Sequence, residues 1–292
     1  MANYTDIAIE NFYSDGKISF GCSEIREEKM GIFKKLSLNI DDISLENKYE
    51  KPRGEYVTVY TPEVIFMSDN EKKKLSEIIS EEIKKMVKKN TKKYFGLDTR
   101  VLLVGLGNQS VTADSLGPLV IKRSEVNSHI RLSSPELFKT VSTSELSAIC
   151  VGVSAETGIE SFRIVKGVSD QISPDAVIAI DSLAARGVER LGCTLQINDS
   201  GISPGSAING NKNKIDKNSI GVPVISIGVP FIVDSASLIM DSIEKSGYSV
   251  PEKIKKTAIE RRFFVAPKDC DVIVDEWSKI ISSAIRSCFW SI

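Results

Sequence analysis

The apolar positions of the chain follow two patterns that predict an alternation of strands and helices. Four short apolar runs show no internal alternation, as is typical of strands covered on both faces of a parallel sheet. They are Val101–Val104, Ala148–Val153, Ala176–Ile180 and Val222–Ile227. Apolar residues at helical spacing predict helices over Gly158–Ile172 and Asp269–Trp290. This order is typical of an α/β fold with a doubly wound sheet.

The first hundred residues carry weaker signals. Tyr56–Tyr60 alternates β-branched and aromatic residues and predicts a strand. Ser68 stands three residues before Glu71, which predicts a capping box at the start of an amphipathic helix. Residues 1–50 mix short apolar segments with charge, and we interpret them as an extended lead-in. Since no repeat or linker interrupts the chain, we expect a single α/β domain.

Composition excludes several classes of function. The 292 residues are 41% hydrophobic and carry a formal net charge of −1, which gives no overall attraction to nucleic acid or to an anionic membrane. The five cysteines are scattered without a C-x-x-C pair, so neither a disulfide framework nor a zinc knuckle is indicated. The N-terminus does not resemble a signal peptide, and no apolar run reaches the roughly 18 residues of a membrane span. We therefore expect a cytoplasmic protein with no nucleic acid or membrane partner.

Two aspartates are the strongest candidates for chemistry. Asp114, in V-T-A-D-S-L-G-P, and Asp181, in A-I-D-S-L, each follow a predicted core strand, so both could reach one crevice at the carboxyl ends of the strands. Two carboxylates held close together cannot both ionise cheaply, so one can act as general acid and the other as general base. Such a pair can hydrolyse an amide without a covalent intermediate. Taken singly, each aspartate also suits the N-cap of a following helix, which is the commoner role.

Other candidate residues carry weaker signals. Asp234 follows an apolar run and could point into the same crevice or cap a helix. Asn108 lies in the same turn as Asp114 and is a candidate for a supporting role. His129 is the single histidine, which excludes a multi-histidine metal site and leaves it at most a supporting role. Gly105-Leu106-Gly107 lacks the third glycine of a dinucleotide fingerprint, and no G-x-x-x-x-G-K phosphate loop is present.

Four long motifs resemble those of the germination proteases of spore-forming bacteria. In chain order they are G-L-G-N-Q-S-V-T-A-D-S-L-G-P (Gly105–Pro118), P-D-A-V-I-A-I-D-S-L-A-A-R (Pro174–Arg186), T-L-Q-I-N-D-S-G-I-S-P-G-S (Thr194–Ser206) and G-V-P-V-I-S-I-G-V-P-F-I-V-D (Gly221–Asp234). K-P-R-G-E-Y-V-T-V and F-V-A-P-K-D-C-D-V also match, so the resemblance covers most of the chain. It implies a three-layer α/β sandwich around a mostly parallel mixed sheet, similar to that of the hydrogenase-maturation proteases.

The resemblance also implies an activity. The family is an atypical aspartic endopeptidase that degrades small acid-soluble spore proteins during germination, in the spore core, as a homotetramer and without a metal or other cofactor. Its two proposed catalytic residues map onto Asp114 and Asp181, the pair that the residues alone single out.

The family is made as a self-processing zymogen whose cleavage motif is similar to (Thr/Phe)-Glu-(Ile/Phe)-Ala-Ser. Residues 5–10, T-D-I-A-I-E, resemble it with aspartate in place of glutamate. Our hypothesis is cleavage between Asp6 and Ile7, with residues 1–6 as propeptide and 7–292 as a single protease domain. The alternative is that T-D-I-A-I-E forms a short edge strand. If this segment occupied the crevice, it would block substrate until acidification protonated groups around it.

Two other functions remain open from the sequence. A metal-dependent, maturation-type protease could use the same aspartates, and sensitivity to a chelator would reveal it. A non-catalytic sporulation protein could keep the fold to bind a peptide or partner, and it would bind a spore-protein peptide without forming product.

Overall fold

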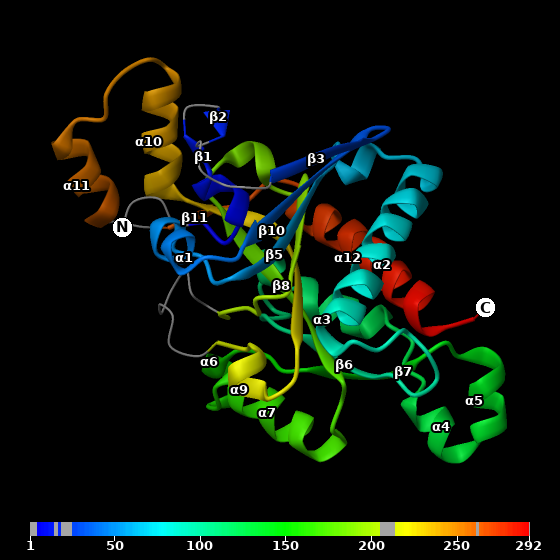
Figure 1. The fold of residues 1–292 in the computed structure, drawn as a ribbon. Helices are drawn as coiled ribbons and strands as arrows, with labels where there is room; N and C mark the ends of the chain where they lie inside the picture. The colour runs from blue at the N-terminus through cyan, green and yellow to red at the C-terminus, as the bar shows by residue number, and fades with distance from the viewer. Residues whose placement is uncertain (1–4, 15–16, 19–24, 205–213, 261–262, 292) are drawn as a thin grey trace.

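The computed structural model describes residues 5–14, 17–18, 25–204, 214–260 and 263–291. Within them, a nine-stranded mixed sheet runs in the order β3-β4-β5-β9-β10-β8-β6-β7, and β11 pairs with β10 (Figure 1). Residues 1–4 of the expected propeptide lie outside the described residues. So do residues 205–210 of the glycine-rich segment that follows β9.

The sheet has a parallel half and an antiparallel half. β7, β6, β8 and β10 pair in parallel, whereas β9, β5, β4 and β3 continue the sheet with antiparallel pairs. A separate hairpin joins β1 and β2. The strands are β1 Tyr13–Ser14, β2 Lys17–Ile18, β3 Ile25–Met30, β4 Phe33–Ile40, β5 Gly54–Tyr60, β6 Arg100–Gly105, β7 Glu145–Cys150, β8 Ala176–Ala185, β9 Thr194–Asn198, β10 Val224–Asp234 and β11 Phe264–Val265.

Helices cover both faces of the sheet, which confirms the predicted three-layer α/β class. One core lies under α2 and α12 and includes Trp277 and Phe231; another lies under α7 and includes Val104 and Val165 (Figure 1). The α-helices are α1 Ile43–Tyr49, α2 Asp69–Thr91, α3 Leu116–Arg123, α4 Ser128–Ser133, α5 Pro135–Val141, α6 Ser154–Thr157, α7 Ser161–Ile172, α9 Lys217–Ile220, α10 Ser235–Lys245, α11 Glu252–Glu260 and α12 Cys270–Phe289. The 3-10 helices are η1 Ala8–Asn11, η2 Val64–Phe66, η3 Thr112–Asp114 and η4 Val188–Arg190.

Most elements predicted from periodicity are confirmed, but the interpretation of residues 1–50 as a lead-in is wrong. The Ser68 hydroxyl accepts a hydrogen bond from the Glu71 backbone, and the Glu71 carboxylate accepts one from the Ser68 backbone, so α2 begins with the predicted capping box. β4, by contrast, lies inside the sheet and pairs with both β3 and β5. Its apolar residues Leu36, Leu38 and Ile40 alternate with polar ones and are buried, a short strand pattern that the surrounding charge obscured.

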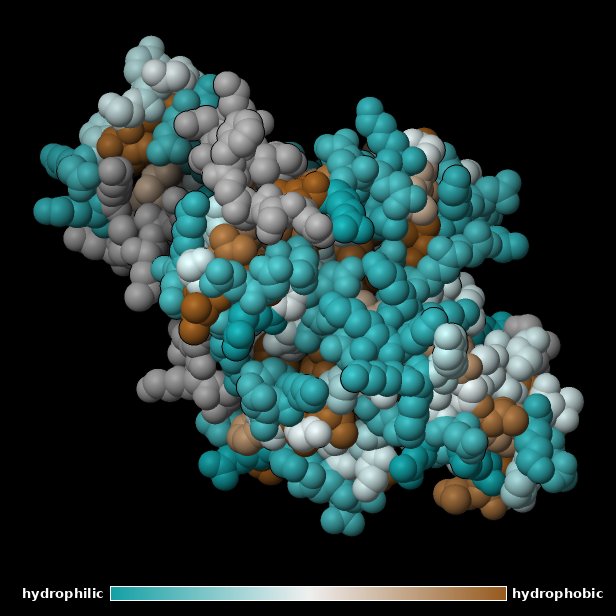
Figure 2. All heavy atoms as spheres, in the orientation of Figure 1, coloured by the Kyte–Doolittle hydropathy of each residue, from teal (hydrophilic) through white to brown (hydrophobic). Residues whose placement is uncertain are grey.

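The surface in Figure 2 is largely hydrophilic. Exposed apolar side chains gather at the corner formed by α4 and α5, where Leu132 and Leu137 lie on the outside (Figure 2). No helix in the described part of the chain combines the length and hydrophobicity of a membrane span.

Candidate active site

Asp114 lies in a glycine turn that leaves β6. The backbone N–H of Asn108 donates to Asp114 Oδ2 at 2.8 Å, so Asn108 contacts the carboxylate through its main chain. Gly107 has φ +107°, and a Cβ there would lie 2.1 Å from the Asp114 carbonyl oxygen. A residue with a side chain could not occupy this position without moving the turn. The glycine pattern therefore brings Asp114 back over the end of β6.

The structure does not support a capping role for Asp114. The N-cap of α3 is Ser115, and Asp114 ends the short helix η3 before it. Its carboxylate binds the Asn108 backbone instead of the first turn of α3. The carboxylate is thus positioned by the turn rather than used to begin a helix.

Asp181 lies inside β8, not after it. The strand continues to Ala185 because the apolar residues after Asp181 remain paired with β10 as far as Val233. The expectation that Asp181 ends a strand and precedes a helix is therefore wrong. Its side chain accepts a hydrogen bond from the Ser182 backbone at 2.9 Å, and the residue is only 7% exposed.

The charge of Asp114 acts on the ionisation of Asp181. Burial raises the pKa of Asp181 well above its ordinary value, and the negative charges of Asp114 and Asp6 raise it further. Burial also raises the pKa of Asp114, while the Asn108 N–H lowers it by stabilising the carboxylate. The structure therefore brings together the pair that the sequence selected and makes Asp181 the harder of the two to ionise.

The N-terminal segment binds β8 three residues beyond Asp181. The Asp6 N–H donates to the Ala184 carbonyl at 2.8 Å, and the Ala184 N–H donates to Asp6 Oδ2 at 2.8 Å. Gln196, on β9, donates from Nε2 to the Asp6 carbonyl at 3.1 Å and accepts from the Ala8 N–H at 2.7 Å. The Gln196 amide thus spans the Asp6–Ile7 peptide bond.

Residues 5–10 do not form the short edge strand that was the alternative to a cleavage site. After its contact with β8 the segment turns into the 3-10 helix η1, and Ile7, Ala8 and Ile9 are at most 1% exposed. Lys51 donates from Nζ to the Thr5 carbonyl at 2.7 Å. Burial lowers the pKa of the Lys51 ammonium, whereas the negative charge of Asp6 raises it.

Asp234 and His129 lie away from the pair. Asp234 is the last residue of β10 and caps α10, since its Oδ1 accepts from the Ala236 N–H at 2.7 Å. Asp181 is level with Gly228 on β10, so Asp234 lies six residues further along the strand, about 20 Å away at 3.3 Å per residue. His129 is exposed on α4, beside the amino end of β7, whereas the aspartates lie toward the carboxyl ends of β6 and β8.

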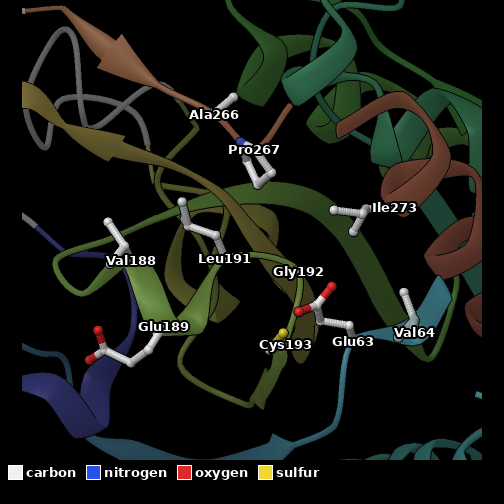
Figure 3. Close-up of a pocket in the computed structure, with 10 residues that line it drawn as sticks. All are labelled: Glu63, Val64, Val188, Glu189, Leu191, Gly192, Cys193, Ala266, Pro267 and Ile273. Atoms are coloured by element: carbon white, nitrogen blue, oxygen red, sulfur yellow. The ribbon is translucent and has the colours of Figure 1, made fainter. Parts of the chain in front are cut away.

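Two surface hollows do not contain the aspartates. The pocket in Figure 3 lies between η4 and the start of α12. Its single thiol, Cys193, is no activated nucleophile, because burial and the nearby Glu63 raise its pKa. A second hollow is lined by Gly107, Gln109 and Ser110 from the Asp114 turn. The segment that contains Asp6 lies close enough to Asp181 for its charge to raise the pKa of that residue.

The described part of the chain was also searched for side chains that could form a metal centre. Within it, no group of three or more histidine, cysteine, aspartate or glutamate side chains is arranged to hold an ion.

Comparison with known proteins assigns the family. The family model described as germination protease matches residues 13–249. The chain belongs to the germination protease family. It is 38% identical to the germination protease of Caldanaerobacter subterraneus subsp. tengcongensis, over 97% of this chain and 92% of that one. It is 31% identical to that of Clostridium tetani, over 98% and 95% of the two chains. The chain is therefore a spore protease.

Among solved structures, a NiFe hydrogenase maturation protease, HycI from Thermococcus kodakarensis KOD1, is also similar. It shares 18% identity, with a TM-score of 0.32, and the match covers 63% of this chain and 92% of that one.

Two residues that contact the N-terminal segment were not selected from the sequence. Gln196 is 4% exposed within β9, and Lys51 precedes β5. Both stand in motifs that carry the family resemblance, T-L-Q-I-N and K-P-R-G. Gln196 stands between Leu195 and Ile197 in a strand that alternates polar with apolar residues, and this pattern does not reveal which peptide bond the amide contacts.

Proposed function

We propose that this chain is an aspartic endopeptidase, made as a zymogen, that cleaves itself between Asp6 and Ile7 and then degrades small acid-soluble spore proteins. The observation that carries the proposal is the position of the Asp6 carbonyl. It is held by Gln196 Nε2 in a segment that pairs with β8 just beyond Asp181. The negative charge of Asp6 acts on the pKa of Asp181, which is consistent with a scissile bond beside the catalytic pair.

The proposed mechanism uses the pair as acid and base around one water molecule. Asp114 is ionised and removes a proton from the water as its oxygen attacks the Asp6 carbonyl carbon. Asp181 is protonated and donates a hydrogen bond to the carbonyl oxygen, together with Gln196 Nε2. When the tetrahedral intermediate collapses, the Asp6–Ile7 bond breaks and the proton taken from water passes to the Ile7 nitrogen. The roles follow the environments, because Asp181 is the more deeply buried acid.

The same contacts explain how the unprocessed chain would stay inactive. The segment fills the crevice with a substrate-like backbone, so no other peptide can enter. Asp181 must hold its proton for the step, and burial raises its pKa. We therefore expect processing to slow as the pH rises through the raised pKa of Asp181.

The test is self-processing of the full chain, followed by mass spectrometry for the loss of residues 1–6. We expect Asp114→Asn and Asp181→Asn to slow cleavage by about 10²- to 10⁴-fold, since each removes one half of the acid–base pair but keeps its shape. Asp234→Asn is the matched control and should process normally, because it keeps an acceptor for the Ala236 N–H.

Three outcomes would contradict the proposal in different ways. Normal processing of Asp181→Asn would remove the aspartate pair from the mechanism. Loss of wild-type processing with a chelator would favour the metal-dependent alternative. An intact chain under all conditions, together with binding of a spore-protein peptide without product, would favour the non-catalytic alternative.

A further inference from the structure

The carboxylate of Glu10, a residue of η1, is enclosed by donors. Glu10 is 2% exposed, and its Oε2 accepts from the Arg186 N–H at 2.9 Å and its Oε1 from the Gly187 N–H at 3.0 Å. Arg190 Nε lies 2.8 Å from the same Oε1, and the Thr5 hydroxyl also donates to Oε2. A buried carboxylate is stable only with such partners.

The donors around Glu10 are held by the rest of the protein. Arg190 Nη1 donates to the Tyr60 hydroxyl at 2.6 Å, and the Arg190 guanidinium lies 5.1 Å from the centre of the Tyr60 ring. Arg186 Nη2 donates to the Glu10 carbonyl at 2.7 Å, so the main chain is bound as well as the side chain. Arg186 and Gly187 lie in the turn between β8 and η4, and Arg190 is the last residue of η4. Together their donors form a preorganised anion site.

The site has a fixed relation to the scissile bond. β8 carries Asp181 inside the strand and leads directly into the donors at Arg186 and Gly187. Glu10 is the fourth residue after the Asp6–Ile7 bond, and η1 gives the intervening chain a turn rather than an extended form. A peptide whose scissile bond lies beside Asp181 therefore presents its fourth following side chain to Arg190.

We propose that Arg190 and the backbone N–H groups of Arg186 and Gly187 form a carboxylate subsite that recognises a glutamate four residues after the scissile bond. It binds Glu10 in the unprocessed chain and the equivalent glutamate of a protein substrate afterwards. The inference rests on the proposed function and adds a specificity element outside the five-residue motif that the family resemblance implies. The competing explanation is that the Glu10 contacts only anchor the N-terminal segment.

The test uses peptides, so that folding of the enzyme is not affected. The first peptide has the sequence of residues 3–13, the second carries Glu10→Gln, and the third carries Glu10→Gln with Asn11→Glu, which moves the charge by one position. Each is offered to full-length chain that has processed itself, and kcat/KM is measured. The enzyme's own Ile7–Glu10 segment competes equally with all three peptides, so the ratios between them are unaffected.

We expect Glu10→Gln to lower kcat/KM by about ten-fold or more, and the shifted glutamate not to restore it. An Arg190→Gln enzyme should cut the first two peptides at similar, reduced rates, because the charge preference depends on the guanidinium. The matched control is Arg163→Gln, which removes an exposed arginine paired with Glu160 on α7 and should keep the full preference.

The possible results distinguish failure of the proposed glutamate subsite from failure of the proposed protease function. Cleavage of the first two peptides within about two-fold of each other by the wild-type enzyme would overturn the subsite and leave the proposed protease in place. Failure to cut any peptide, with no self-processing, would overturn both. If the Arg190→Gln enzyme kept the preference for the Glu10 peptide, Arg190 would not be the residue that recognises the glutamate.

Discussion

At the scale of single residues, three aspartates with similar sequence surroundings have different environments. Asp114 is bound by the Asn108 N–H, Asp181 is buried beside two other carboxyl groups, and Asp234 caps a helix. Each stands near an apolar run, so local sequence alone could not distinguish them. Their neighbours in space decide whether a carboxyl group holds a proton, loses it or begins a helix.

Gln196 is the residue whose role is most open to test. Gln196→Met keeps the side-chain length but removes the donor to the Asp6 carbonyl and the acceptor for the Ala8 N–H. We expect processing to slow by about 10²- to 10³-fold, as for the loss of a donor to a developing oxyanion. Mass spectrometry of the full chain over time measures it.

The control for this substitution is Gln171→Met, on the exposed side of α7. It should process at the wild-type rate. If Gln196→Met processed equally fast, Gln196 would only pack within β9, and its contact with the Asp6 carbonyl would not contribute to catalysis.

At the scale of elements, β8 links three parts of the site. It carries Asp181, pairs with Asp6 through Ala184, and ends at the donors that bind Glu10. This arrangement depends on the strand continuing past Asp181. A helix beginning there would have carried Ala184 and Arg186 away from the segment that contains Asp6.

Asp234 stabilises the start of α10. Asp234→Ala removes the side-chain acceptor for the Ala236 N–H, so we expect the free energy of unfolding to fall by about 0.5–2 kcal/mol. Processing of the folded protein should be unchanged. Denaturant unfolding and the processing assay measure the two effects.

Asp42→Ala, at the N-cap of the exposed helix α1, provides the comparison, since Asp42 also accepts from a backbone N–H of the first turn. Loss of processing in Asp234→Ala with unchanged stability would instead place Asp234 in the catalytic machinery.

At the scale of the whole molecule, the N-terminal segment is part of the core. Ile7 and Ile9 pack with Leu183 of β8, and Phe12 stacks on Tyr49 with ring centres 3.7 Å apart. The segment therefore contributes to the stability of the folded chain. Cleavage after Asp6 would leave these apolar anchors attached to the rest of the chain.

We expect the stability of the whole molecule to depend on pH through Asp181. The raised pKa of Asp181 means that the folded state holds this proton more tightly than the unfolded chain does. That contribution to stability is fully present below the ordinary aspartate pKa and is lost as the pH rises through the raised value. Asp181→Asn removes the ionisation, so the Tm of the wild type should fall relative to that of the variant as the pH rises.

Thermal unfolding of both proteins from acidic to alkaline pH measures this difference. Asp98→Asn, at a fully exposed side chain, controls for the loss of one negative charge. A Tm difference that stays constant across the series would mean that Asp181 is ionised in the same pH range in the folded and unfolded chains.

Elements with strong local signals could be predicted from the sequence. The α/β class, the capping box before α2 and the position of α12 follow from periodicity and local hydrogen-bonding chemistry. The Asp114–Asp181 pair was selected because both residues stand near the ends of apolar runs. The glycines of Gly105-Leu106-Gly107 also predict a turn, because glycine permits backbone conformations that other residues avoid.

Contacts between segments far apart in the chain could not be predicted and became apparent only in the folded structure. The length of β8 depends on its pairing with β10, and the burial of β4 depends on β3 and β5, none of which local patterns reveal. Gln196 and Lys51 reach the N-terminal segment across roughly 190 and 46 residues of chain, as their hydrogen bonds show. Residue type and spacing specify the groups available for chemistry, whereas long-range strand pairing brings them to one peptide bond.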